Sequence, residues 1–185
     1  MSRHLGGLVL LLAVLAGDIG SAWGAETKPA TPNSKPRLEV TVNPRRISRM
    51  SGSDYDNRAQ SVCLEIRVVS REMTRNLQGL KAELYAIGKN ITTRDLKLLG
   101  SDVLEFDLLA KGTYTGHGEA VSFEFDDHDT VKFGAKYQGH LVVIKDGDDQ
   151  IIATNATKPE YLKGYDQIKK LTKGKKKDFT LGSSR

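Results

Sequence analysis

The run Asp126-Asp127-His128-Asp129 is the densest group of polar side chains in the sequence, with three carboxylates and one imidazole in four residues. Oxygen-rich groups of this kind suit a hard cation such as calcium, which takes about six to eight oxygen ligands. The run lacks the spacing of a calcium-binding loop, and Asp is also common in turns because its side chain bonds the local backbone. We therefore interpret the run first as a charged turn between strands, and keep its members as candidate metal ligands: Asp126, Asp127, His128 and Asp129.

Outside this run the sequence offers no arrangement for catalysis. His117 and His140 have no second ligand at the spacing of a zinc site. The single cysteine, Cys63, falls within a predicted strand and has no reactive signature around it. Nucleophile elbows, phosphate loops and dinucleotide fingerprints are absent from the sequence. We expect no catalytic residue, no cofactor and no enzymatic activity, with Cys63 a free thiol.

Two groups of residues suit binding without chemistry. Tyrosine and histidine on loops provide contact area with a polar tip, so we expect contacts from Tyr55, Tyr114 and His117. The chain has a net charge of +5, and residues 158–185 hold nine Lys or Arg against three acids. A basic end of this kind suits an anionic polymer or lipid headgroups, and no nucleic-acid fold signature accompanies it. The lysines that we expect to make this contact are Lys175, Lys176 and Lys177.

The N-terminal residues predict export. Arg3 and His4 precede an almost wholly apolar run to Ala16, and Ala22 and Gly24 stand at the small-residue positions of a cleavage site. We expect a signal peptide over 1–24 and a Pro-rich linker over 25–36. A secreted chain with one cysteine has no internal disulfide, which fits the periplasm or cell envelope of a bacterium. We expect no segment that spans the membrane.

Alternating apolar residues along 37–157 predict strands that are buried on one face. Val62, Leu64, Ile66 and Val68 form the clearest run, and Asp146-Gly147 between two apolar runs predicts a hairpin. Seven or eight short strands of this kind favour an all-β, antiparallel sandwich of two sheets.

The end of the sequence changes character after this β domain. Thr157 and Glu160 have capping-box spacing around Pro159, and they predict a short helix over 158–172. We expect the remainder, 173–185, to be a disordered basic tail.

The segment Ala135-Lys136-Tyr137-Gln138-Gly139 resembles the tyrosine corner of immunoglobulin-like and fibronectin type III domains. The resemblance implies that the Tyr137 hydroxyl bonds to upstream backbone. Gly139 stands where immunoglobulin domains carry their second cysteine, so the resemblance is to the disulfide-free branch. It covers about residues 37–156 and concerns the fold, not the function.

These observations predict a non-catalytic, secreted interaction module of the periplasm or cell envelope that binds another protein or an anionic polymer. Few aromatic residues are left over for a glycan platform, which favours a protein partner. Two alternatives stay open: a small secreted metal-assisted hydrolase, and a structural envelope protein tethered by its basic tail. The sequons at Asn90 and Asn155 matter only in a eukaryotic host.

Overall fold

The computed structural model describes residues 35–50, 58–127, 132–173 and 178–179, and only the backbone at 49, 50, 58, 127, 173 and 178. The predicted signal peptide, Tyr55, His128, Asp129 and Lys175–Lys177 lie outside these residues. The strands are β1 (Leu38–Met50), β2 (Arg58–Ser70), β3 (Leu77–Asn90), β4 (Leu96–Leu108), β5 (Thr113–His117), β6 (Val121–Asp127), β7 (Lys132–Lys145), β8 (Ile151–Ala156) and β9 (Asp178–Phe179), and the helices are α1 (Pro159–Lys163) and α2 (Tyr165–Lys173). None of the described helices is long and apolar enough to cross a membrane.

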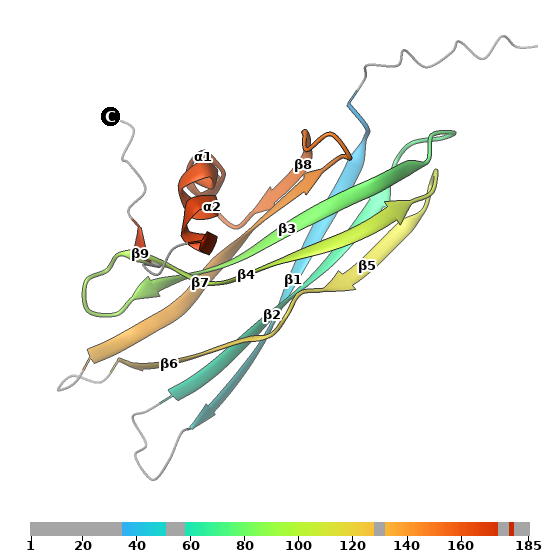
Figure 1. The fold of residues 1–185 in the computed structure, drawn as a ribbon. Coiled ribbons are helices and arrows are strands. Elements are labelled where there is room, and N and C mark those ends of the chain that lie inside the picture. The colour runs from blue at the N-terminus through green and yellow to red at the C-terminus, as the bar shows by residue number, and fades with distance from the viewer. Residues whose placement is uncertain (1–34, 51–57, 128–131, 174–177, 180–185) are drawn as a thin grey trace, which may run out of the picture. The chain divides into compact units, whose positions relative to one another are not determined.

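The strands pair antiparallel in the order β1-β2-β6-β7-β3-β4-β9, with β5 paired to β2 and β8 to β7 (Figure 1). The structure thus confirms a mostly β, antiparallel fold with a short C-terminal helix. This pairing joins the described strands into one sheet. The predicted division into two sheets does not appear in it.

β7 connects the two halves of this sheet. Its first residues pair with β6 up to Gly134, and its residues from Ala135 onward pair with β3. Gly134 has a φ of +77°, and a Cβ there would lie 2.1 Å from the carbonyl oxygen of Glu124. Because only glycine fits such a position, this residue sets the point at which the strand changes partners.

The predicted alternation is confirmed in the main core. Val62, Leu64, Ile66 and Val68 of β2 are at most 4% exposed, and they pack in one cluster with alternate residues of β3. The same cluster includes Phe106 and Leu108 of β4 and Val142 and Ile144 of β7, so its residues come from both halves of the sheet.

A second core lies beneath the helices, which Figure 1 shows beside β8 and β3. Tyr161, Tyr165 and Ile168 pack there with residues of β3, β4 and β7. The predicted helix is interrupted at Gly164, where α1 ends. Its predicted capping box is not formed: Lys158 is the N-cap, and the Thr157 hydroxyl accepts a hydrogen bond from the backbone N–H of His140 instead.

Three residues of the predicted disordered tail, 173–185, belong to described elements: Lys173 ends α2, and Asp178 and Phe179 form β9. β9 pairs with Leu96 and Lys97 at the edge of β4. Phe179 is only 5% exposed because its ring fills the second core. This part of the tail therefore belongs to the folded domain.

Candidate functional site

The structure places the predicted contact residues Tyr114 and His117 in different environments. Tyr114 lies on β5, and its ring stacks on Phe106 with 4.1 Å between centroids and 9° between planes. It is half-buried and packs against the main core, so it is not the exposed loop contact that the sequence predicted. The reason is that the expected loop forms a strand paired with β2. His117, the last residue of β5, is exposed, and its role as a contact stays a prediction.

The acidic run begins inside β6. Asp126 is 7% exposed, and Asp127 lies opposite Lys132 in the β6–β7 register. Because His128 and Asp129 lie outside the described residues, the run as a whole cannot be assembled into a ligand set. Within the described part of the chain, no three His, Cys, Asp or Glu side chains lie close enough to hold a metal ion.

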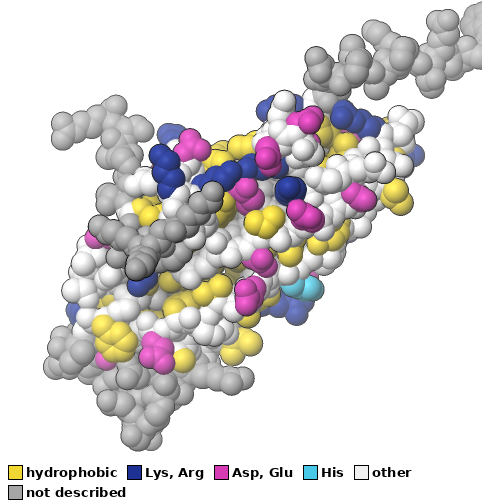
Figure 2. Space-filling model, viewed as in Figure 1, with side chains coloured by type: hydrophobic (Ala, Val, Ile, Leu, Met, Phe, Trp, Pro, Cys, Tyr) yellow, Lys and Arg dark blue, Asp and Glu magenta, His cyan; other side chains and the backbone are white. Residues whose placement is uncertain are grey.

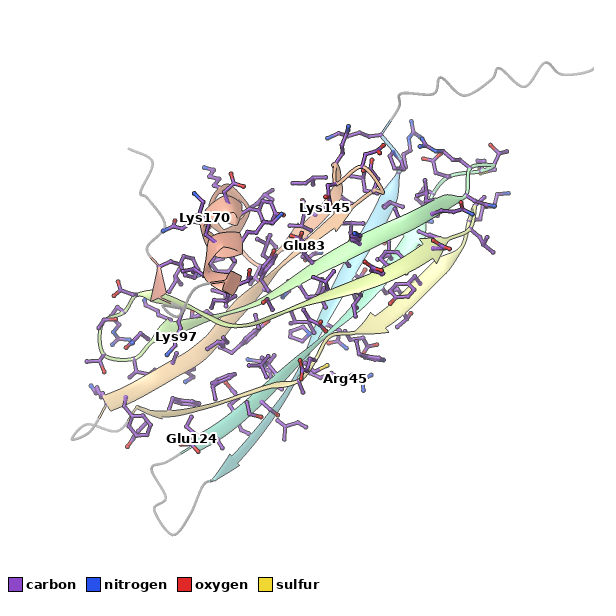
Figure 3. All side chains as sticks on the ribbon, viewed as in Figure 1. Arg45, Glu83, Lys97, Glu124, Lys145 and Lys170 are labelled. Atoms are coloured by element: carbon purple, nitrogen blue, oxygen red, sulfur yellow. The ribbon has the colours of Figure 1, made fainter. Side chains whose placement is uncertain are left out.

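A buried charge network joins β3, β7 and α2. Figure 3 shows Glu83 and Lys145 side by side near the helices, and Lys145 Nζ donates a hydrogen bond of 2.7 Å to Glu83 Oε1. The other carboxylate oxygen accepts hydrogen bonds from Tyr85 at 2.7 Å and Tyr165 at 2.6 Å. Lys169 Nζ lies 3.7 Å from Oε1. Four donor groups from three elements thus surround one carboxylate.

This network tunes the ionisation of its members. Burial alone raises the pKa of Glu83, but hydrogen bonds from Lys145, Tyr165 and Tyr85 outweigh it and lower the pKa to about 2. Burial alone lowers the pKa of Lys145, but the Glu83 carboxylate raises it overall. Both groups are therefore charged at neutral pH. Because the carboxylate already accepts these bonds, the network suits holding α2 on the sheet better than reacting with a substrate.

A second polar cluster surrounds His140, which is 8% exposed. Its Nε2 lies 3.0 Å from Asn155 Oδ1, and its Nδ1 lies 3.1 Å from Thr157 Oγ1 and 3.4 Å from the Tyr137 hydroxyl. Among the described residues this ring, not upstream backbone, is the partner of the Tyr137 hydroxyl, unlike in the tyrosine corner. Burial lowers the pKa of His140, so its ring favours the neutral form.

Asn155 ties this cluster to the start of the domain. Its Nδ2 donates to the carbonyl oxygen of Val40 at 2.8 Å, which links β8 to β1. Both the oxygen and the nitrogen of the Asn155 side-chain amide therefore make hydrogen bonds within the fold.

A basic pocket of about 390 Å³ lies where the β3–β4 turn meets β7; it is lined by Lys89, Asn90, Ile91, Arg94, Lys132, Lys136 and Gln138. The turn is held against β7 by two hydrogen bonds, from Ile91 N–H to Gly134 O at 3.0 Å and from Thr92 Oγ1 to Lys132 O at 2.7 Å. Asn90 Oδ1 closes the turn by accepting from the N–H groups of Thr92 and Thr93.

Like charges meet inside this pocket. Lys89 of β3 lies directly opposite Lys136 of β7, a pairing that destabilises a sheet. Among the described residues no carboxylate lines the pocket, and none pairs with Lys89, Arg94 or Lys132. Lys136 Nζ also lies 5.7 Å from the centre of the Phe125 ring. The arrangement concentrates positive charge and can attract an anion.

Local backbone irregularities shape the same pocket. The β3–β7 register shifts between Ile87 and Gly88, whose partners are Gly139 and Tyr137, so Gln138 is the extra residue of a β-bulge. Bulges re-aim side chains and are frequent next to binding sites. Arg94 has a φ of +67°, which is uncommon for a residue with a side chain.

Figure 2 shows acidic and basic side chains interspersed across the visible face, with hydrophobic side chains between them. Sequence reasoning missed the pocket because its residues come from two segments that only the β3–β7 pairing brings together. The one signal in the sequence was the presence of basic residues at the ends of two predicted strands.

The comparisons with known proteins do not show a family. No protein-family model matches the sequence, and no curated protein matches it. Among solved structures, a protein from Bordetella pertussis that carries the name ApaA has 9% identity and a TM-score of 0.36, over 68% of this chain and 95% of the other. The structural genomics target SoR45 has 10% identity and a TM-score of 0.33, over 66% and 87%.

A third solved structure, the β-D-glucoside glucohydrolase from Trichoderma reesei, has 14% identity and a TM-score of 0.29, over 65% of this chain and 18% of the enzyme. Likenesses at these TM-scores are distant. They carry no argument about the function of this chain.

Proposed function

We propose that this chain is a non-catalytic, secreted interaction module of the periplasm or cell envelope of a bacterium, and that it binds an anionic polymer through the basic pocket. The observation that carries this proposal is the convergence of Lys89, Arg94, Lys132 and Lys136 on one pocket that no described carboxylate lines. This feature favours an anionic partner over the protein partner expected from the sequence.

The energetics of the pocket support this proposal. Opposed lysines weaken a sheet, and a non-glycine residue with positive φ is strained. Costs of this kind persist at sites that are kept for binding. No described carboxylate pairs with Lys89, so an anion bound beside it would offset this cost, and a bound ligand is expected to stabilise this part of the sheet.

As part of the same proposal, the fold is a sandwich of the immunoglobulin-like or fibronectin type III-like kind. Its layers would be β1-β2-β5-β6 and β3-β4-β7-β8. The shared core of β2, β3, β4 and β7 supports this arrangement. The basic pocket would then lie at one end of the second layer, at a turn, where sandwich domains present binding residues.

The test compares binding of the mature protein to a polyphosphate, a polyglutamate and neutral dextran. We expect both anionic polymers to bind, with affinity that falls as salt rises from about 50 to about 300 mM. The double variant Lys89→Gln, Lys136→Gln removes two charge contacts of about 0.7 kcal/mol each, which makes binding about tenfold weaker. The matched control, Lys163→Gln with Lys170→Gln on the exposed sides of α1 and α2, changes net charge equally and should bind like the wild type.

Equal losses in the two double variants, or no binding of either anionic polymer, would overturn the proposal. A third variant with Gln at Lys175, Lys176 and Lys177 separates the pocket from the tail. This variant is preferable to deleting 173–185, because deletion would also remove the buried Phe179. If only the tail variant loses binding, the pocket is not the site and tethering through the tail is favoured.

A further inference from the structure

We propose that the basic pocket recognises a phosphomonoester group carried on a saccharide or a lipid headgroup. This inference rests on the proposed function, because it names the chemical class of the anion that the same pocket binds.

The number of cations in the pocket matches a dianion better than a single carboxylate. A phosphomonoester carries a charge of about −1.5 to −2 at neutral pH and has three terminal oxygens that accept hydrogen bonds. A carboxylate carries one charge on two oxygens. Four cationic side chains from β3, the β3–β4 turn and β7 line the pocket, and two of them are directly opposed across the β3–β7 pair. Among the described residues no carboxylate pairs with Lys89, Arg94 or Lys132, and a single carboxylate ligand would balance only one of these three charges.

The pocket combines two kinds of cation. Arg94 presents a planar guanidinium that can bind two oxygens of a phosphate or a carboxylate at once, whereas Lys89, Lys132 and Lys136 act as point charges. The left-handed conformation of Arg94 belongs to a turn closed by hydrogen bonds from Asn90 N–H to Asp95 O at 2.8 Å and from Arg94 N–H to Asn90 O at 3.1 Å. This turn fixes the backbone from which the guanidinium extends.

Two side-chain amides in the pocket are available for the group that carries the phosphate. Asn90 uses its Oδ1 to close the turn, and its Nδ2 donates to no described residue. Gln138, the bulged residue, also makes no side-chain hydrogen bond among the described residues. Amides of this kind suit the hydroxyl groups of a sugar or a glycerol unit.

The size of the pocket indicates that the phosphate is attached to an organic group. A volume of about 390 Å³ falls in the range of about 300–1,000 Å³ that is usual for small-molecule sites. Ile91 adds a half-buried apolar wall beside the polar groups. A bare anion would leave most of this space to water.

Calorimetric titration of the mature protein tests the inference with three ligands that share one ring: glucose 6-phosphate, glucuronate and glucose. We expect glucose 6-phosphate to bind at least about tenfold more tightly than glucuronate, with glucose weakest. Affinity for the phosphate should fall as pH drops through about 6, where its second proton binds, while affinity for glucuronate stays level. Backbone amide signals of 89–94 and 132–138 should shift in NMR spectra.

Arg94→Lys is the conservative variant that separates fork geometry from charge. It should weaken glucose 6-phosphate binding although the positive charge is kept, because lysine cannot bind two oxygens at once. Glucuronate affinity equal to that of glucose 6-phosphate, or signal changes confined to other residues, would overturn the inference. If polyglutamate still bound in that case, the proposed function would stand, whereas loss of every anion would overturn both.

The source of the phosphate is decided with vesicles. Phosphatidic acid carries a phosphomonoester, and phosphatidylglycerol carries a phosphodiester. Preferential binding to phosphatidic acid vesicles assigns a lipid headgroup. Binding of glucose 6-phosphate without that preference assigns a saccharide.

Discussion

Replacing Glu83 with Gln is the sharpest test of what holds the C-terminal helices on the sheet. The substitution keeps the size of the side chain and removes its charge. Lys145, which is only 4% exposed, would lose the carboxylate that its ammonium contacts at 2.7 Å. Lys169 Nζ, which lies 3.7 Å from Glu83 Oε1, would then face the same unpaired cation.

The structure sets the size of the expected effect. Holding the pKa of Glu83 at about 2 in place of 4.5 corresponds to about 3 kcal/mol of native-state stabilisation at neutral pH, at about 1.4 kcal/mol for each pKa unit. Breaking a buried ion pair by removing one partner costs about 3–5 kcal/mol, which agrees. We expect Glu83→Gln to lose about 3 kcal/mol of unfolding free energy, or roughly 6–12 °C in Tm.

The pH dependence has a definite sign. Because folding lowers the pKa of Glu83, its contribution is fully present above about pH 4.5 and is lost as pH falls from about 4.5 towards 2. Urea unfolding at pH 7 and at pH 3 should therefore show a large difference between wild type and variant at pH 7 and a smaller one at pH 3.

Two further variants complete this test. Glu105→Gln removes an exposed pair with Lys81 at 3.6 Å and should cost no more than about 0.5 kcal/mol. Glu83→Gln combined with Lys145→Met should recover part of the loss, because no buried cation is left unpaired. If Glu83→Gln were as stable as Glu105→Gln, the network would not hold the helices and this reasoning would be refuted.

Other substitutions test the remaining structural statements. Phe179→Ala should cost about 3 kcal/mol in urea unfolding, because it opens a cavity in the second core; an unchanged midpoint would show that β9 does not contribute to the fold. Gly134→Ala should lower the free energy of unfolding by more than about 1 kcal/mol, because its Cβ would lie 2.1 Å from the Glu124 carbonyl oxygen and its φ is +77°. If the variant kept full stability, Gly134 would not be the residue that sets where β7 changes partners. Expressed through a eukaryotic secretory pathway, the protein should carry no glycan at Asn155, because both ends of that amide are hydrogen-bonded, and a glycosylated, folded product found by mass spectrometry would contradict this.

Much of the β architecture was predictable because it depends on local patterns. Alternation at Val62–Val68 predicts which side chains face the core, and the four apolar residues of that run are buried. Asp146-Gly147 predicts the β7–β8 hairpin, and Asp146 Oδ1 indeed accepts hydrogen bonds from the N–H groups of Asp148 and Gln150. Turn and alternation signals span a few residues, so they need no knowledge of distant neighbours.

Predictions failed where a distant neighbour competed for the same group. The Thr157 hydroxyl has capping-box spacing, but it pairs with His140, which precedes it by 17 residues. Tyr114 was expected on a loop, but pairing with β2 and stacking on the ring of Phe106 leave it half-buried against the main core. In each case the group found a partner that lies far away in the sequence, and a local pattern cannot show such a partner.

By itself, the sequence determined the strand-rich class of this protein, the inward face of its clearest strands and its short C-terminal helix, because periodicity and turn residues act over a few positions. Only the tertiary structure decided which charges meet. Glu83 and Lys145 are 62 residues apart, and the basic pocket joins the end of β3 to the start of β7. Electrostatic sites depend on distances of a few ångströms between side chains, and strand pairing sets those distances.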